Sequence, residues 1–214
     1  MNPIKVVDLG SGTGSSIDAF LKEGKAHFDN VREIQSHECL GIDLNESNRS
    51  EIEAKGYNYA TCDILSEYES LPIADYYLAF DFLEHLPSKE YADSIVKLMA
   101  TRSTVAVWLR MPSFEPDFVS GEGVLRLSDL RFSWTTWTGH PTPYLVSQAV
   151  GALFPFMSKV VVCPSKLVHS TEDDWIVPID SPIDTVSYHK SLGNKINIAF
   201  SPPLVRAWDV IGIK

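Results

Sequence analysis

Residues Val6–Phe20 read VVDLGSGTGSSIDAF, and the expected architecture can be built outward from them. A short apolar run comes first, three glycines follow at every second position (Gly10, Gly12 and Gly14), and an amphipathic run begins at Ser15. Glycine lets backbone N–H groups approach an anion closely, and the start of a helix places that anion at the positive end of the helix dipole. A plain strand-to-helix turn needs fewer glycines, so the spacing predicts a ligand-binding turn.

The segments that follow alternate between strand-like and helix-like patterns. Short apolar runs rich in β-branched or aromatic residues predict strands, and apolar residues three or four apart predict helices. The strands predicted in the first half are Lys5–Asp8, Leu40–Asp43, Tyr57–Cys62, Asp75–Phe80 and Thr104–Leu109. The predicted helices are Ser15–Lys22, with a helical continuation over Ala26–Ile34, then Arg49–Lys55 and a helix that opens at Ser88. This alternation predicts a parallel sheet with helices on both faces.

The second half of the chain has a different pattern. Met111–His140 is rich in aromatic residues, glycine and proline, and a helix is predicted over Tyr144–Phe154. The strands predicted after it are Lys159–Cys163, Lys195–Phe200 and Arg206–Ile213. The last two, joined by Ser201-Pro202-Pro203, are expected to pair antiparallel at a sheet edge. No linker interrupts the sequence, so we expect a single domain over 1–214, with 111–140 as an insertion after the fifth strand.

The composition restricts the class of protein. The chain has 214 residues and a net charge of −10, from 18 basic and 28 acidic side chains. Nucleic-acid binding needs a basic surface and no Lys/Arg cluster is present, so a small-molecule partner is favoured over nucleic acid. No apolar run reaches the length of a membrane span, no signal peptide is visible, and three widely spaced cysteines form neither a metal pair nor a disulfide framework. We therefore expect a cytoplasmic protein with no membrane association and no metal site, and with a homodimer as one option for its assembly.

The spacing of the glycines distinguishes two kinds of nucleotide ligand. The dinucleotide fingerprint G-x-G-x-x-G needs its third glycine where Ser15 stands. The pattern here is acid-x-G-x-G-x-G, and it begins at Asp8. It resembles motif I of the class I S-adenosylmethionine (SAM)-dependent methyltransferases, which implies SAM as the cofactor and S-adenosylhomocysteine as its product. A nicotinamide-dependent oxidoreductase stays open as an alternative.

Further segments resemble the same family in the expected order. GIDLNES places Asp43 at the end of the second strand, ATCDILS places Asp63 after the third, and DYYLAFDFLEHLP covers the fourth strand and the following loop. Gly139-His140, with the helix and strand after it, resembles the segment after strand five. The resemblance covers most of Lys5–Val162. It implies a Rossmann-like, doubly wound α/β fold with a seven-stranded, mostly parallel sheet and an antiparallel edge strand.

The resemblance also implies which residues bind SAM. They are Asp8, Gly10, Ser11, Gly12, Gly14, Asp43, Leu44, Asp63, Ile64, Asp81 and Phe82. The glycine turn would hold the methionine carboxylate, with Asp8 near the ammonium group and Asp81 on the other side of the methionine moiety. Asp43 would accept hydrogen bonds from the ribose hydroxyls, and Asp63 would face the adenine amine. Turn residues at strand ends are the simpler interpretation of the last two acids.

Two histidines are candidates for catalysis. His85 follows the fourth predicted strand, at the sheet edge where reacting groups lie, and an imidazole titrates in the range useful for proton transfer. Packing or helix capping is its alternative role. His140 is the second candidate, and Glu84 is expected to be an acid in the first turn of a helix. Trp134 and Trp137, in RFSWTTWTGH, either wall an acceptor pocket or fill a core under a loop.

The absence of two motifs reduces the number of acceptor classes to be considered. Neither N/D-P-P-Y/F nor Pro-Cys follows the fourth strand, so methylation of nucleobase or glutamine amino groups, or of cytosine C5, is not indicated. We expect methyl transfer from SAM to a small-molecule hydroxyl, amine or carbon acceptor. A non-catalytic SAM-binding relative is an alternative, because the chain begins almost at its first strand, without the helices that cover the site in many relatives. A methyltransferase acting on nucleic acid or protein is a third option.

Overall fold

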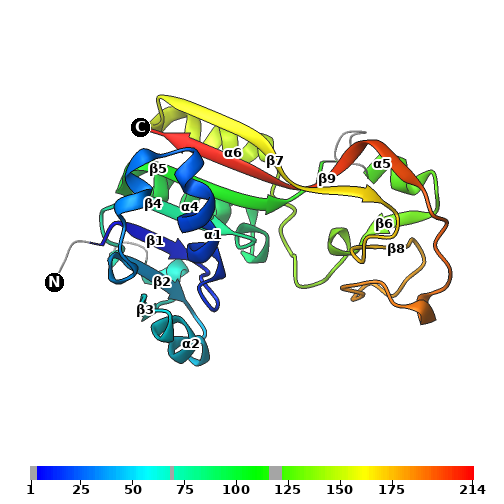
Figure 1. The fold of residues 1–214 in the computed structure, drawn as a ribbon, viewed down its shortest axis with the longest axis horizontal. Helices are drawn as coiled ribbons and strands as arrows, with labels where there is room; N and C mark the ends of the chain where they lie inside the picture. The colour runs from blue at the N-terminus through cyan, green and yellow to red at the C-terminus, as the bar shows by residue number, and fades with distance from the viewer. Residues whose placement is uncertain (1–3, 68–69, 116–121) are drawn as a thin grey trace.

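The computed structural model describes residues 4–67, 70–115 and 122–214, and a seven-stranded mixed sheet forms its centre (Figure 1). The strands lie in the order β3-β2-β1-β4-β5-β9-β7. Their bounds are β1 Val6–Leu9, β2 Cys39–Asp43, β3 Asn58–Thr61, β4 Ala74–Phe80, β5 Ser103–Pro112, β7 Lys159–Ser170 and β9 Ala199–Ile213. The first five run parallel, and β9 runs antiparallel between β5 and β7. The predicted Rossmann-like, seven-stranded sheet is confirmed.

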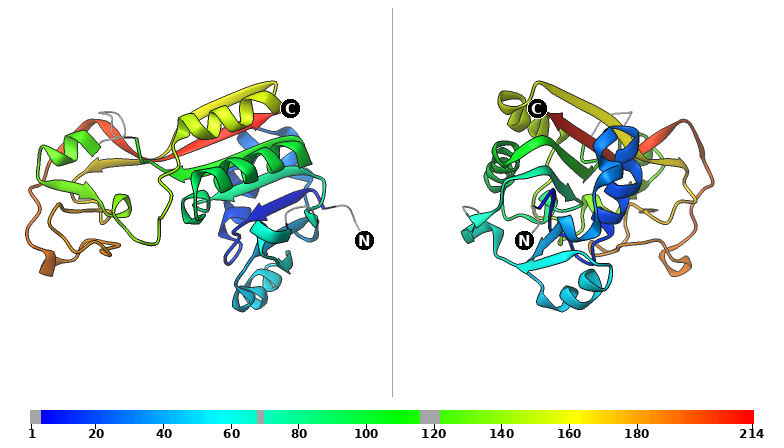
Figure 2. Two further views of the ribbon diagram at one scale, coloured as in Figure 1. Left: turned by 180° about the vertical axis from the view of Figure 1, so that it is seen from behind. Right: turned by 60° about the vertical axis from the view of Figure 1, so that its left-hand side comes forward.

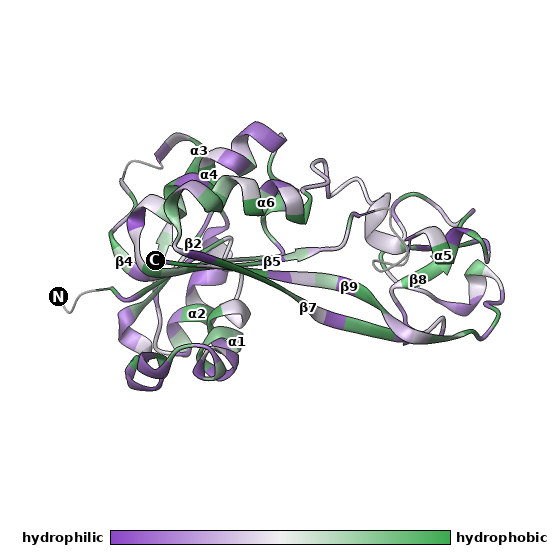
Figure 3. Ribbon diagram, turned by 90° about the horizontal axis from the view of Figure 1, so that it is seen from above, coloured by the Kyte–Doolittle hydropathy of each residue, from purple (hydrophilic) through white to green (hydrophobic). Residues whose placement is uncertain are grey.

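Helices cover both faces of this sheet (Figure 3). α1 (Ser15–Glu23) and α2 (Arg49–Ala54) pack on one face, and α3 (Ile64–Glu67), α4 (Lys89–Arg102) and α6 (Val146–Leu153) pack on the other. Strands enclosed on both sides carry nearly continuous apolar sequences, and β4 (ADYYLAF) is buried at six of its seven positions. The doubly wound arrangement therefore follows from the apolar runs and the helical periodicity between them.

The ends of the helices follow local signals, with one exception to the predicted pattern. α1 begins after Gly14, which adopts a left-handed conformation, and the Ser88 hydroxyl accepts a hydrogen bond from the Tyr91 N–H at the start of α4. The predicted helical continuation over Ala26–Ile34 is wrong. Short 3₁₀ turns replace it, because Phe28 is extended and packs into the core, with its ring centroid 5.2 Å from that of Tyr76.

Two long antiparallel strands, β7 and β9, extend beyond the sheet and carry a second, smaller lobe (Figures 1 and 2). The lobe contains α5 (Glu122–Arg126) and a two-stranded antiparallel sheet of β6 (Leu130–Phe132) and β8 (Ile176–Pro178). It has a small apolar core of its own, which includes Leu125, Phe132, Trp134, Ile176 and Leu204. The predicted insertion 111–140 supplies much of this lobe, and its residues 116–121 lie outside the described part of the chain.

The predicted hairpin across Ser201-Pro202-Pro203 is wrong, because β9 continues through these residues as one strand. They lie outside the part of β9 that pairs with β5, beside β7, at a place where the register between β7 and β9 shifts. Proline lacks the N–H that a central strand needs, and such a position tolerates its absence. Within the described residues, no helix combines the length and the apolar character needed to cross a membrane.

Candidate active site

The glycine turn follows β1 at the carboxyl edge of the parallel strands, the edge at which open α/β sheets bind ligands. Gly10, Gly12 and Gly14 have φ values of 68°, 49° and 82°, which favour glycine. A Cβ atom on Gly10 would lie 2.2 Å from a ring carbon of Phe82, whereas one on Gly12 would meet no atom of the described residues within 4 Å. Open space therefore lies directly beyond Gly12, where the sequence places a ligand.

Asp8 lies beneath this turn and is fully buried. Neither carboxylate oxygen meets the geometry of a hydrogen bond with the described residues. Burial raises the pKa of Asp8 well above its usual range; the charge of Asp43 adds to the shift, and the nearby Ser16 side chain opposes it. A buried carboxyl with unpaired oxygens would be stabilised by a cationic or N–H-bearing group above the turn.

Asp43 closes β2 and holds the turn in place. Its Oδ2 accepts a hydrogen bond from the Gly12 N–H at 2.8 Å, and its Oδ1 accepts one from the Asn45 N–H at 2.9 Å. Each carboxylate oxygen can accept a further hydrogen bond, so the two hydroxyls of a ribose remain compatible partners. The neighbouring Leu44 is 72% exposed and lies beside the predicted nucleoside position.

Asp63 has a local role in this structure. Its Oδ1 accepts a hydrogen bond from the Leu65 N–H at 3.0 Å, and its Oδ2 accepts one from the Ser66 hydroxyl at 3.0 Å, so the carboxylate caps α3. Ile64 is buried behind it in the core. These local hydrogen bonds agree with the simpler interpretation, in which Asp63 is a turn residue.

The segment after β4 connects the glycine turn to a cavity. Phe82 covers Gly10, and Asp81 lies beside it with a positive φ of 50°. One oxygen of the Asp81 carboxylate pairs with the Lys166 ammonium at 3.1 Å, across to β7. A non-glycine residue at positive φ is strained, and such strain is common at functional sites.

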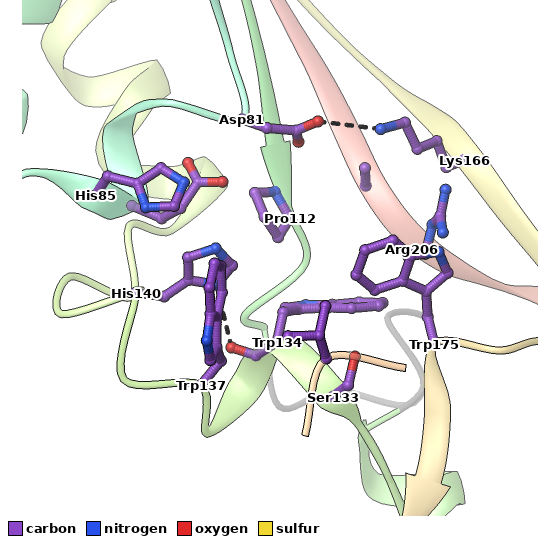
Figure 4. Close-up of a pocket in the computed structure, with 13 residues that line it drawn as sticks. Asp81, His85, Pro112, Ser133, Trp134, Trp137, His140, Lys166, Trp175 and Arg206 are labelled. Atoms are coloured by element: carbon purple, nitrogen blue, oxygen red, sulfur yellow. Dashed lines mark hydrogen bonds and ion pairs between the residues drawn. The ribbon is translucent and has the colours of Figure 1, made fainter. Parts of the chain in front are cut away.

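The cavity has a volume of about 270 Å³ and lies between the sheet edge and the second lobe (Figure 4). Its walls come from both parts of the molecule. The sheet side contributes Asp81, Glu84, His85, Pro112, Lys166, Arg206 and Ala207, and the lobe side contributes Ser133, Trp134, Trp137, His140, Trp175 and Val186. The prediction that Trp134 and Trp137 wall a pocket agrees with this lining. Trp134 also belongs to the core of the lobe, so both interpretations of that residue apply.

His85 and His140 approach each other at one wall, with ring centroids 4.8 Å apart. The His85 Nδ1 lies 2.7 Å from the Gly139 carbonyl oxygen, and the His140 Nδ1 lies 3.2 Å from that of Trp134. A carbonyl oxygen only accepts, so each Nδ1 carries the proton, and each Nε2 keeps its lone pair when the ring is neutral. Burial and the neighbouring His85 lower the pKa of His140, which favours that neutral form.

Glu84 is a site residue that sequence reasoning missed. It lies in a 3₁₀ turn, Leu83–His85, and not in the first turn of α4, which begins at Lys89. The side chain is buried, neither carboxylate oxygen has a hydrogen-bond partner among the described residues, and burial together with the charge of Asp81 raises its pKa to about 8. Only its position between two leucines, Leu83 and Leu86, could have signalled this burial from the sequence.

Comparisons with known proteins bear on the fold. No protein-family model matches the chain, and no curated protein sequence matches it. Among solved structures, a SAM-dependent methyltransferase from Archaeoglobus fulgidus matches with a TM-score of 0.61 at 17% identity, over 100% of this chain and 87% of the other. The YcgJ protein from Bacillus subtilis matches with a TM-score of 0.58 at 15% identity, over 99% and 92% of the two chains. Magnesium protoporphyrin IX methyltransferase from Synechocystis, with bound S-adenosylhomocysteine, matches with a TM-score of 0.54 at 12% identity, over 99% and 74%.

The chain has the class I SAM-dependent methyltransferase fold. Within this methyltransferase fold the predicted site residues form two groups. The first gathers Asp8, the glycine turn and Asp43 at the ends of β1 and β2. The second gathers Asp81, His85 and His140 around the cavity, although 55 residues separate the two histidines in the sequence. Phe82 contacts the first group and lies within the segment that lines the second.

Proposed function

We propose that the protein transfers a methyl group from SAM to a small molecule bound in the aromatic cavity. The observation that carries this proposal is the adjacency of two sites at one sheet edge: open space over Gly12 and a cavity lined by the segment after β4. A transfer between two bound molecules needs such neighbouring sites, because it depends on holding the reacting atoms in line.

The residues of the first group fit SAM. The backbone of the glycine turn would hold the methionine carboxylate in the space beyond Gly12, and the orphaned Asp8 carboxyl would meet the ammonium group. Asp43 would bind the ribose hydroxyls through the remaining lone pairs of its oxygens. We further propose that Leu44, Asp63 and Ile64 flank the adenine, with Ser11, Asp81 and Phe82 bordering the methionine end.

The chemistry divides between cofactor and protein. When bound, SAM supplies a methyl group already activated by its sulfonium. The chain's own residues then orient the acceptor and exclude water from the path of transfer. For a hydroxyl or amine acceptor, the proton would pass to the Nε2 lone pair of His85 or His140, which the carbonyl contacts of the Nδ1 atoms leave available.

The cavity favours a planar acceptor. Trp134, Trp137 and Trp175 present ring surfaces to it, and the Arg206 guanidinium lies 5.1 Å from the ring centroid of Trp175. Aromatic rings bind flat apolar bodies, and a nearby guanidinium attracts an acidic substituent. We therefore propose a small planar molecule with a hydroxyl, amine or carbon nucleophile, and no nucleic acid.

We also propose that residues 1–214 act as one domain, because both lobes supply walls of the same cavity. Among the described residues, Cys39, Cys62 and Cys163 are free thiols. Free thiols suit a reducing compartment and support a cytoplasmic location.

Two measurements test the function. Mass spectrometry of the purified protein should detect co-purified SAM or S-adenosylhomocysteine. Incubation with SAM labelled at the methyl group and a small-molecule cell extract should then yield a labelled product in the low-mass fraction. Transfer of label only to macromolecules would overturn the small-molecule proposal, and binding of SAM without any transfer would favour a non-catalytic role.

A further inference from the structure

Three side chains at the cavity wall form a cluster, and one of them, Glu84, has no part in the proposed methyl transfer. Glu84 and His85 come from the turn after β4, and His140 comes from the loop that returns from the second lobe. One donor atom of each lies within 4.8 Å of the donor atoms of the other two. Figure 4 shows His85 and His140 directed toward one another from these separate segments.

Both imidazoles have one ring nitrogen in contact with a backbone carbonyl. The Nδ1 atoms of His85 and His140 face backbone carbonyl oxygens at 2.7 and 3.2 Å, which fixes the proton on Nδ1. Histidine ligands in metal sites typically donate their second ring N–H to a carbonyl or carboxylate, and this contact fixes the tautomer and aims the free nitrogen at the metal.

Glu84 supplies the charge. Its side chain is 1% exposed, and both carboxylate oxygens lack a hydrogen-bond partner among the described residues. A buried carboxylate is unfavourable unless a cation or several donors satisfy it. With the proton on Nδ1, the second nitrogen of each neutral imidazole carries a lone pair and cannot donate a hydrogen bond to Glu84. A metal ion is the partner that satisfies all three groups together.

We propose that Glu84, His85 and His140 bind one divalent transition-metal ion at the cavity wall. One carboxylate oxygen and two imidazole nitrogens suit Mn²⁺, Fe²⁺, Co²⁺ or Zn²⁺ better than the all-oxygen ions Mg²⁺ and Ca²⁺. Side-chain rotation at the cavity wall would bring the donor atoms to the spacing of about 3 Å that bonds of about 2.1 Å impose. This inference goes beyond the proposed function and does not depend on SAM binding.

Three protein ligands leave coordination positions open toward the cavity. An acceptor oxygen could occupy one of them, and a bound metal lowers the pKa of a coordinated hydroxyl. In that state the two imidazoles are ligands and take no proton, so the coordinated hydroxyl would release its proton to water and the metal would stabilise the oxyanion that accepts the methyl group. A chain that binds the metal is therefore expected to prefer oxygen acceptors over carbon acceptors.

The test titrates the chelator-treated full chain with Co²⁺ alone and follows its visible absorption. We expect one Co²⁺ per chain with a spectrum typical of nitrogen and oxygen ligands. Loss of even an outer-shell partner weakens metal binding about 10- to 100-fold, so Glu84→Gln and His140→Ala should each weaken it by at least about tenfold. Glu90→Gln and His169→Ala are the matched controls, because both side chains are exposed and lie outside the cluster.

Thermal denaturation of each variant confirms that it is folded, and Glu84→Gln keeps the volume of the side chain while it removes the ionisable carboxyl group. Absence of Co²⁺ binding, or stoichiometric binding that neither cluster variant weakens, overturns the metal site. Titration with S-adenosylhomocysteine in the presence of chelator separates the two proposals. Tight binding there without any Co²⁺ site would refute only this inference, and a Co²⁺ site without nucleoside binding would refute only the proposed function.

Discussion

Replacement of Gly12 by alanine separates ligand binding from folding. The φ of Gly12 is 49°, and an L-residue in this left-handed region costs roughly 1–2 kcal/mol of stability. No further cost is expected, because the added methyl group meets no protein atom within 4 Å. A folded variant with a modestly lowered melting temperature is therefore the expected product.

The same methyl group fills the space in which we place the methionine carboxylate of SAM. A ligand carboxylate held by backbone N–H groups would have to retreat from the turn and lose at least one charge-assisted hydrogen bond, worth about 1.5–3 kcal/mol. That loss corresponds to about a ten- to hundredfold rise in Kd. The Gly12→Val change adds further atoms in the same space and should abolish binding.

Isothermal titration calorimetry with S-adenosylhomocysteine measures the affinity, and thermal denaturation measures the stability. Gly151→Ala is the control, because its Cβ also meets nothing within 4 Å but lies on α6, away from the turn. The control should bind normally and gain about 0.5–1 kcal/mol of stability, the usual effect of removing a helical glycine. A folded Gly12→Ala variant whose affinity equals that of the parent protein would refute the placement of the ligand.

Three further predictions concern the surrounding side chains. The pKa of Glu84 is about 8 in the folded protein, against an ordinary value of 4.5. Its protonated carboxyl therefore stabilises the metal-free protein fully below pH 4.5, and this contribution is lost as the pH rises to 8. Chemical denaturation with chelator present should therefore show the parent losing about 3 kcal/mol relative to Glu84→Gln between pH 5.5 and 8; parallel profiles would contradict the buried charge. Asp43→Asn replaces one of the two oxygens that accept from the Gly12 and Asn45 N–H groups by an NH2 donor, and it should raise the Kd for SAM about tenfold or more in calorimetry; an unchanged Kd would exclude the ribose role. Trp137→Ala should raise the KM for the acceptor about tenfold while the Kd for SAM stays constant, and the reverse pattern would move the acceptor elsewhere.

The first half of the fold could be predicted because its signals are local. A continuous apolar run such as β4 predicts a buried strand, and the glycine spacing after β1 predicts a turn, each from a few neighbouring residues. The β7–β9 ribbon could not be predicted in the same way. Ser201-Pro202-Pro203 has the composition of a turn, and only its pairing with β7 makes it part of a strand.

The candidate site likewise contains residues whose proximity could be predicted from the sequence and residues whose proximity could not. Asp8, Gly12 and Asp43 lie where consecutive strands end, so their proximity follows from the order of the parallel sheet. Glu84 and His140 come together because the chain returns from the second lobe to the sheet edge. The sequence around either residue does not predict that return. Burial of Glu84 likewise arises from packing at the cavity wall, because a glutamate before a helix is usually a solvated residue.

The central claim is that the glycine turn holds SAM, and a paired calorimetric titration of the full chain with SAM and with NADH tests it most directly. We expect saturable binding of one SAM per chain, displaced by S-adenosylhomocysteine, and no heat from NADH under the same conditions. Tight binding of NADH with no binding of SAM would contradict it and would favour the oxidoreductase alternative.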